Sequence, residues 1–123
     1  KHFPPESKAQ MDELVQMLLD AYRVSITELS WMGEETKKKA LEKLDTFVPK
    51  IGYPDEWRDY SSLDIDPGDL LANVQAGNEF ELARELAKIG APLDRNEWFM
   101  TPQTVNAYNP GFNEIVFPAA ILQ

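Results

Sequence analysis

The chain has 123 residues, the size of one compact domain, and it carries 12 basic against 21 acidic side chains, a net charge of −9. Such a surface repels phosphate backbones and anionic lipid headgroups, so we expect no nucleic-acid partner. The absence of cysteine excludes disulfides and thiolate metal sites, and no stretch reaches the roughly 20 apolar residues of a membrane-spanning helix, so we expect no membrane contact.

The first predicted element is an amphipathic helix over residues 8–29. Ser7 and Gln10 form a capping-box pattern, in which each side chain satisfies a backbone donor of the first turn. Apolar residues then recur every three or four positions. They are Met11, Leu14, Val15, Leu18, Leu19, Tyr22, Ile26 and Leu29. We expect this stripe to be buried.

A second helix is predicted over residues 33–47. Glu34 and Glu35 suit the positive end of its dipole, and the lysines lie farther along. Pro49 prevents its continuation. The short link through residues 30–32 predicts that the two helices form an antiparallel pair.

The middle of the chain is predicted to be irregular before it becomes helical again. Residues 51–55 should be extended and end in a turn, because a residue before proline avoids helical geometry, and residues 60–66 should also be irregular. A third helix is expected over residues 67–89, since Pro67 suits a first turn. Gly90 is placed for a left-handed cap at its end.

After residue 94 the pattern changes from helical to alternating. Residues 104–108 and 113–117 are β-prone runs on either side of 109–112, where Pro-Gly fits a type II turn. We therefore predict a β-hairpin, which needs the helices or a larger sheet for support. The predicted fold class is mainly α, an α+β arrangement of three main helices followed by a C-terminal β-hairpin.

These elements suggest three successive segments of one compact unit. Residues 1–50 form the helical pair, residues 51–93 hold the extended turn segment and the third helix, and residues 94–123 hold the hairpin. The chain begins without methionine and ends in the apolar run 119–123, whereas chain ends are usually polar. We expect it to be an internal piece of a longer protein.

Catalytic residues are not evident from the sequence. The one histidine, His2, has no neighbouring carboxylates at ligand spacing, so it does not predict a zinc site. Acidic pairs lie on predicted helices, where charges are usually solvated. Asn106, on a predicted edge strand, could donate to and accept from an extended peptide, although such an asparagine is also commonly a plain solvent-facing residue.

Five blocks of sequence carry a resemblance to a known family. They are residues 31–40 (WMGEETKKKA), 51–54 (IGYP), 97–98 (EW), 105–108 (VNAY) and 113–123 (NEIVFPAAILQ). Their order and spacing resemble those of the neprilysin and endothelin-converting-enzyme family of zinc metallopeptidases. The likeness is weak between residues 55 and 93. One residue fewer than the family pattern separates Tyr108 from Asn113, which bears on the hairpin register.

The resemblance implies a large helical zinc peptidase with a thermolysin-like catalytic lobe and a helical lid. The amino-terminal helices would belong to the lid and crossover, and the hairpin would be an edge of the catalytic lobe. In that family the N-A-[YF] strand binds the substrate backbone. The resemblance thus implies that Asn106 binds through its amide and Ala107 through its main chain, while Ile121 forms a wall of the S1′ pocket.

The resemblance places the zinc-binding motif H-E-x-x-H, a later glutamate ligand and the histidine that stabilises the oxyanion beyond Gln123. We therefore expect no catalytic residue and no metal ligand in this segment, which alone should be inactive and bind no zinc. The longer protein would be a zinc metalloendopeptidase cleaving short peptides. Its compartment is not specified, although the family suggests an extracytoplasmic one.

Two other functions remain open on sequence grounds. The main alternative is a helical protein-interaction module without catalytic activity, which uses acidic faces and exposed tryptophans. A lipid or small-ligand carrier has only the helices in its favour. We also expect self-association of the isolated chain, because surfaces covered in a longer protein would be bare.

Overall fold

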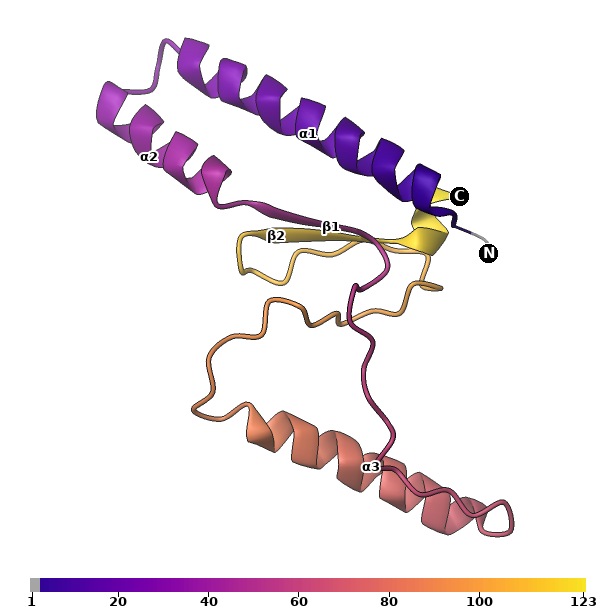
Figure 1. Cartoon of the computed structure of the whole chain (residues 1–123). Coiled ribbons are helices and arrows are strands. Elements are labelled where there is room, and N and C mark those ends of the chain that lie inside the picture. The colour runs from indigo at the N-terminus through magenta and orange to yellow at the C-terminus, as the bar shows by residue number, and fades with distance from the viewer. Residues whose placement is uncertain (1–2) are drawn as a thin grey trace. The chain divides into compact units, whose positions relative to one another are not determined.

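The computed structural model describes residues 3–123, and the single histidine lies outside them (Figure 1). The elements are α1 (Pro5–Glu28), α2 (Glu34–Asp45), β1 (Val48–Gly52), α3 (Leu70–Ala87), β2 (Glu114–Pro118) and the 3₁₀ helix η1 (Ala119–Leu122). The chain divides into two compact units. Unit 1 joins the residues up to Pro54 with Trp98–Gln123, and unit 2 is Asp55–Glu97.

Helix α1 begins earlier than the sequence pattern predicts. Pro4 is its N-cap and Pro5 its first residue, which suits a ring that fixes φ and lacks an N–H. Ser7 therefore lies inside the first turn, where its N–H donates to the Pro4 carbonyl at 3.0 Å. The predicted capping box is wrong, because no side chain caps this helix.

The core of unit 1 lies between α1 and β1. Phe3, Val15 and Ile51 are buried against one another. The partly buried side chains around them are Met11, Leu19, Tyr53, Phe117, Ala119 and Leu122. The apolar stripe of α1 is buried only in part, since Leu18 is 51% exposed and Tyr22 61%.

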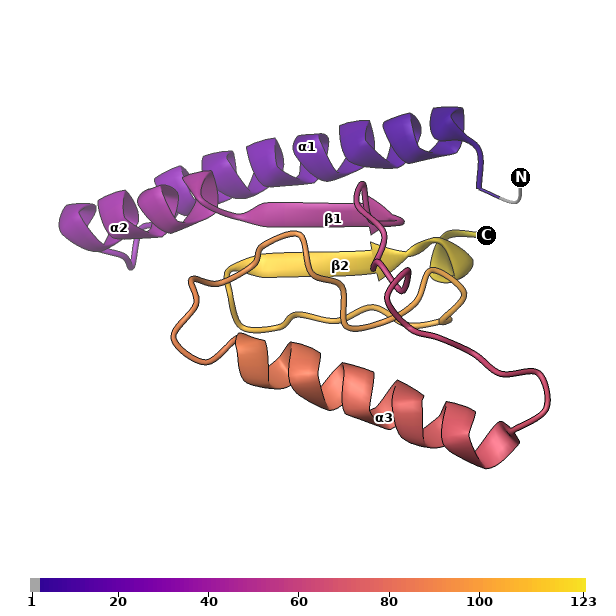
Figure 2. The same ribbon diagram turned by 60° about the horizontal axis from the view of Figure 1, so that its bottom comes forward.

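Helices α1 and α2 form the predicted antiparallel pair, and both views show them side by side (Figures 1 and 2). An ion pair between Arg23 and Asp45 joins them. At the end of α2, the Thr46 hydroxyl donates to the Lys43 carbonyl at 3.0 Å. The chain then enters β1 directly, so the helix pair and the strands share one unit.

The predicted β-hairpin is wrong, because β2 pairs in parallel with β1. Val48 lies opposite Glu114, and Ile51 opposite Phe117. Figure 2 shows the two arrows pointing the same way. A parallel pair requires a long crossover, and the chain between these strands contains α3. At the start of the ladder, the Val48 N–H donates to the Asn113 carbonyl at 3.0 Å.

Only one residue of the first predicted hairpin run pairs with β2. Tyr108 forms an isolated antiparallel bridge to Val116, with N···O distances of 3.1 and 2.9 Å. Before it, the Thr104 N–H donates to the Thr101 carbonyl and the Asn106 N–H to the Thr104 carbonyl. These local bonds bend the chain and replace a ladder, so the run is not a strand.

Unit 2 consists of α3 and the irregular segments on either side of it. Asp69 caps α3, since its carboxylate accepts from the Ala72 N–H at 2.9 Å. The helix therefore begins after Pro67, which lies in a turn held by Asp66. Gly90, just past the helix, has the predicted left-handed conformation with a φ of 78°.

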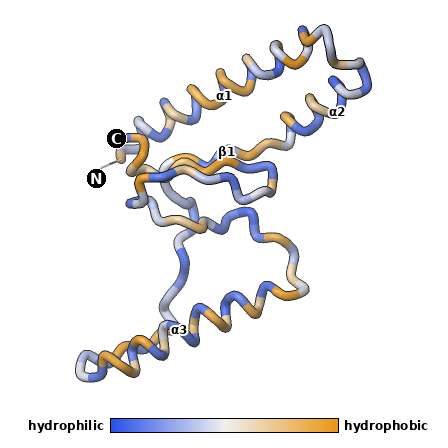
Figure 3. Tube along the Cα trace, turned by 180° about the vertical axis from the view of Figure 1, so that it is seen from behind, coloured by the Kyte–Doolittle hydropathy of each residue, from blue (hydrophilic) through white to orange (hydrophobic). Residues whose placement is uncertain are grey.

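Helix α3 buries none of its residues within the described chain. Leu70 is 77% exposed and Leu71 69%, and Ile89, just beyond the helix, is 79% exposed. Apolar stretches recur along the helix in Figure 3. The Tyr60 ring partly covers Phe80, with the two ring centroids 5.3 Å apart. The other large apolar side chains of the helix, Leu70, Leu71, Val74, Leu82 and Leu86, stay exposed.

Candidate peptide-binding edge

The candidate edge is the segment 106–108, which lies beside β2. Tyr108 directs both of its main-chain groups to Val116. In an extended chain, neighbouring residues direct their main-chain groups to opposite sides. An extended Ala107 would thus direct its main-chain groups away from β2, toward the side on which another extended chain could pair.

Asn106 and Ala107 combine satisfied and unsatisfied polar groups. The Ala107 N–H donates to the Asn106 Oδ1 at 2.8 Å. The Asn106 side chain is exposed, and within residues 3–123 neither its Nδ2 group nor the Ala107 carbonyl has a hydrogen-bond partner. One amide donor and one carbonyl acceptor are thus available at adjacent positions.

Tyr108 anchors this edge through its side chain as well as its backbone. Its hydroxyl accepts from the Phe99 N–H at 2.8 Å. The two rings meet edge to face, with centroids 6.1 Å apart. Downstream, the Asn109 Oδ1 accepts from the Gly111 N–H at 2.8 Å, and Gly111 has the φ of 86° that the predicted type II turn requires.

Asn113 fastens the end of this loop to the helix pair. Its φ of 59° is left-handed, a conformation that asparagine tolerates better than most residues. Its Nδ2 group donates to the Lys43 carbonyl at 2.8 Å and to the Thr46 hydroxyl at 3.0 Å. These two bonds attach the end of the loop to the end of α2.

Ile121, the third predicted site residue, lies in η1 and is 41% exposed. The helix is tied to the segment before the edge, because the Ala120 N–H donates to the Pro102 carbonyl at 2.9 Å. Ile121 and Asn106 thus belong to the same unit. No hydrogen bond among the described residues joins them directly.

The sequence does not predict the buried ion pair that joins β1 and β2. Glu114 is 1% exposed, and its Oε2 lies 2.7 Å from the Lys50 Nζ. The available signal was that Glu114 opens a β-prone run in which Val116 and Pro118 share its face. A charged residue in such a position is normally buried only with a partner.

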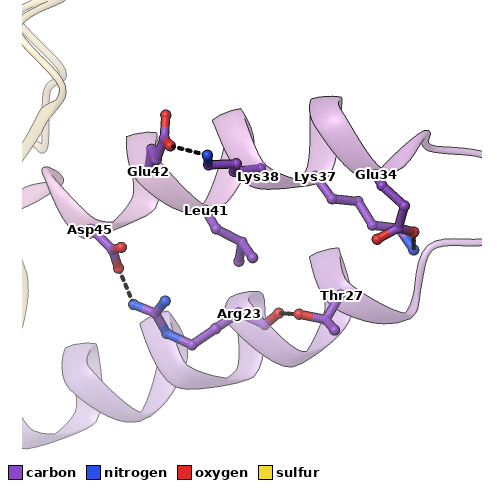
Figure 4. Close-up of a pocket in the computed structure, with 8 residues that line it drawn as sticks. All are labelled: Arg23, Thr27, Glu34, Lys37, Lys38, Leu41, Glu42 and Asp45. Carbon is purple, nitrogen blue, oxygen red and sulfur yellow. Dashed lines mark hydrogen bonds and ion pairs between the residues drawn. The ribbon is translucent and has the colours of Figure 1, made fainter.

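An open groove lies between α1 and α2 (Figure 4). Its charged side chains already pair with one another, as in Arg23 with Asp45 and Lys38 with Glu42. Lys37 likewise lies 3.2 Å from Glu34. Surface pairs of this kind contribute about 0–1 kcal/mol each. Because no strong unmet charge remains, this groove is a weaker candidate site than the edge.

Unit 2 carries a separate cluster of charges along α3. Arg84 bonds to Glu81 at 2.9 Å and to Glu97 at 2.7 Å, and Lys88 bonds to Glu97 at 2.7 Å. Burial acts to raise the pKa of Glu97, but the hydrogen bonds from Lys88 and Arg84 outweigh it and hold that pKa below its usual value. The hydrogen bond from Arg84 likewise lowers the pKa of Glu81. Carboxylates held ionised in this way suit a structural role better than general acid catalysis.

The described residues do not fit a zinc site. Across residues 3–123, no three histidine, cysteine, aspartate or glutamate side chains gather closely enough to hold a metal ion. In the same range, no helix has the length and apolar character needed to cross a membrane.

The chain matches known proteins along its whole length. Residues 1–54 match the family model described as peptidase family M13. The neutral endopeptidase of Lactococcus lactis subsp. lactis is 38% identical over 125 residues, which cover 100% of this chain and 20% of that protein.

Two solved structures extend the match to the fold. The zinc metalloprotease Zmp1 of Mycobacterium tuberculosis, in complex with an inhibitor, is 62% identical, with a TM-score of 0.81 over 94% of this chain and 18% of the other. PepO from Lactobacillus rhamnosis is 37% identical, with a TM-score of 0.88 over 98% of this chain and 20% of the other.

The chain belongs to the M13 peptidases, the neprilysin family. The resemblance found in the sequence is thus confirmed. The chain spans about a fifth of the length of the curated relatives it matches. Within the M13 fold, this stretch consists of three helices and two parallel strands.

Proposed function

We propose that this chain is part of a zinc-dependent metalloendopeptidase and supplies an edge that binds the backbone of the peptide substrate. The observation that carries the proposal is the Tyr108–Val116 bridge, beside which an extended Ala107 would direct its main-chain groups away from β2. Membership of the M13 family supplies the reaction class.

The peptide would lie antiparallel to residues 106–108, in the manner of an added strand. The Ala107 carbonyl accepts from a peptide N–H, and the Asn106 Nδ2 donates to a peptide carbonyl. When the Asn106 side chain rotates, its Oδ1 no longer accepts from the Ala107 N–H. The Oδ1 atom and the Ala107 N–H can then each bond to the peptide. Each exchanged hydrogen bond contributes a net of about 0.5–1.5 kcal/mol.

Ile121 would contact an apolar side chain of the same peptide. It is 41% exposed, so apolar surface remains to be covered there. A large apolar side chain gains about 25 cal/mol for each Å² that it removes from water. This contact favours substrates with such a side chain near the edge.

The zinc ion would be held by residues outside 3–123, because the residues in that range offer no ligand set. This part of the proposal is tested by reading the coding sequence downstream of the Gln123 codon. We expect an H-E-x-x-H motif followed by a further glutamate. A stop codon directly after Gln123 would contradict the proposal.

The role of the edge is tested in the full-length gene product by hydrolysis of an internally quenched peptide with a central Phe-Leu pair. Asn106→Ala should lower kcat/KM by about 10- to 100-fold, since bonds made to the bound peptide are lost. Asn78→Ala is the matched control, because Asn78 is an exposed asparagine on α3. Equal activity of the two variants would refute the role of Asn106.

A helical protein-interaction module is the second candidate function. It is favoured by Trp31, 76% exposed at the turn between α1 and α2, and by Trp57, 66% exposed. Tryptophan is common at the centres of protein interfaces. The same downstream sequence separates the two functions, because this module requires no zinc motif.

A further inference from the structure

The buried ion pair between Lys50 and Glu114 connects the two parallel strands. The Lys50 side chain is 11% exposed and that of Glu114 2%, with 2.7 Å between Nζ and Oε2. An apolar pair of similar volume is often as stable as a buried ion pair, so stability alone does not explain these two buried charges.

The pair lies on one face of the β1–β2 ladder. Along β2, Glu114, Val116 and Pro118 are buried on that face. Phe117 points to the other face, where it packs against the core that includes Ile51. In the observed register Lys50 lies opposite Val116, so Glu114 is its diagonal neighbour on the same face.

A shift of β2 by one residue would move every side chain of β2 to the opposite face. Glu114 would then enter the apolar core beside Ile51, with its charge separated from Lys50. Valine or isoleucine in place of Glu114 would be accepted on either face. A buried carboxylate paired with a cation on one face therefore discriminates between registers in a way that apolar residues do not.

The register of β2 also sets the position of the candidate edge. Tyr108 attaches to Val116, two residues after Glu114 on the same strand. A one-residue shift would move the attached segment by about 3.3 Å relative to β1 and turn it over. Asn106 would then point to the wrong side for a peptide.

From this geometry we infer that Lys50 and Glu114 are positioning residues, which fix the register of β2 and thereby orient Asn106 and Ala107 for peptide binding. The inference rests on the proposed function of the edge. The pair itself touches no substrate and acts through Val116 and Tyr108.

The test uses the 123-residue chain labelled with ¹⁵N and ¹³C. Nuclear Overhauser contacts between β1 and β2 report the register, and titration with the capped peptide acetyl-Ala-Ala-Phe-Leu-Ala-amide reports binding at Asn106 and Ala107. The variant Lys50→Met/Glu114→Met removes both charges at similar volume. We expect its Tm to stay within a few degrees of the original, its inter-strand contacts to split into two sets, and its peptide Kd to rise at least about tenfold.

The charge-exchanged variant, Lys50→Glu/Glu114→Lys, is the rescue. It should restore one set of contacts and a Kd within about threefold of the original, whereas Lys50→Glu alone should not. If the double-methionine variant keeps one register and the original Kd, the inference is wrong. If the double-methionine variant unfolds, the charge-exchanged variant provides the test. Its failure to restore the single register and the original Kd would also overturn the inference.

The two proposals can fail separately. If the original chain shows the single register but no response of Asn106 or Ala107 to the peptide, the peptide-binding edge is refuted, and with it the role of the pair in binding. If the peptide binds equally well in every variant, the edge stands and the positioning inference falls.

Discussion

Unit 1 keeps its strands in place with an apolar core and a buried ion pair, whereas unit 2 is held by ion pairs of part-buried and exposed side chains around a helix that buries none of its residues. The candidate edge lies in unit 1. A binding edge needs fixed geometry, and packed cores hold geometry more firmly than solvated ion pairs do. Substitutions in the two units should therefore have very different effects.

The largest expected difference is between Ile51→Ala and Leu70→Ala. Ile51 is 3% exposed in the core of unit 1, and Leu70 is 77% exposed on α3. The first change should lower the free energy of unfolding of unit 1 by about 3–4 kcal/mol, and the second should change unit 2 by less than about 0.5 kcal/mol. Native-state hydrogen exchange measures each unit separately. Similar losses for both variants would contradict the comparison.

A pair of glycines sharpens the same comparison. Gly52 has a φ of 81°, and a Cβ there would lie 2.6 Å from the Phe3 ring. Gly52→Ala should destabilise unit 1 by about 2–3 kcal/mol. Gly77 lies within α3 with no atom within 4 Å of such a Cβ, so Gly77→Ala should stabilise unit 2 by about 1 kcal/mol. Urea unfolding of both variants provides the check, and the same sign for both would be the contrary result.

The charge cluster should make unit 2 sensitive to acid. The pKa of Glu97 is held below its ordinary value of 4.5, so its contribution is fully present above that pH and is lost as the pH falls through the lowered pKa. The pKa of Lys88 is raised above 10.5, mainly by its hydrogen bond with Glu85, so the stability that Lys88 contributes is lost only above that pH. The charged and titratable groups of this cluster are Arg58, Tyr60, Glu81, Arg84, Glu85, Lys88 and Glu97.

Glu97→Gln should therefore lower the stability of unit 2 at pH 7 by about 1.5 kcal/mol and flatten the loss of stability as the pH falls below 4.5. Amide exchange of α3 as a function of pH provides the measurement. Glu79→Gln is the control, because Glu79 is exposed on the same helix and shows no ion pair among the described residues. An unaltered acid profile of Glu97→Gln would show that other groups govern the transition.

The smallest expected effect is in the helix pair. Arg23→Ala removes the ion pair with Asp45, whose partners are about half exposed. The loss should be about 0.5 kcal/mol and should shrink in 1 M salt. A loss above about 2 kcal/mol would mean that this surface contact supports unit 1 as strongly as its core does.

The sequence predicted the elements whose causes are local. Apolar spacing indicated three helices, and the β-prone run at residues 113–117 is β2 to within one residue. Pro67 suits a first turn and predicts a start of α3 that is too early, because the Asp69 carboxylate caps the helix. Local pattern alone does not choose between two acceptable starts so close together.

Strand pairing depended on residues distant in the sequence and was predicted wrongly. The two β-prone runs were near neighbours, which favoured a hairpin, but β2 takes β1 as its partner. In the first run, the N–H groups of Thr104 and Asn106 already donate to carbonyls of local turns, so they do not pair with another strand. The family was recognised correctly from short blocks, whereas the buried Glu114 appeared only once the strands were paired.

Pro49 makes the outer edge of β1 a poor partner for another strand. The Val48 N–H points to β2, so the main-chain groups of the next residue face outward, and there Pro49 has no N–H to give. The neighbouring outward carbonyl, that of Ile51, already accepts from Tyr53. Sideways accretion of a foreign strand, the first step toward amyloid-like stacking, is therefore disfavoured along β1.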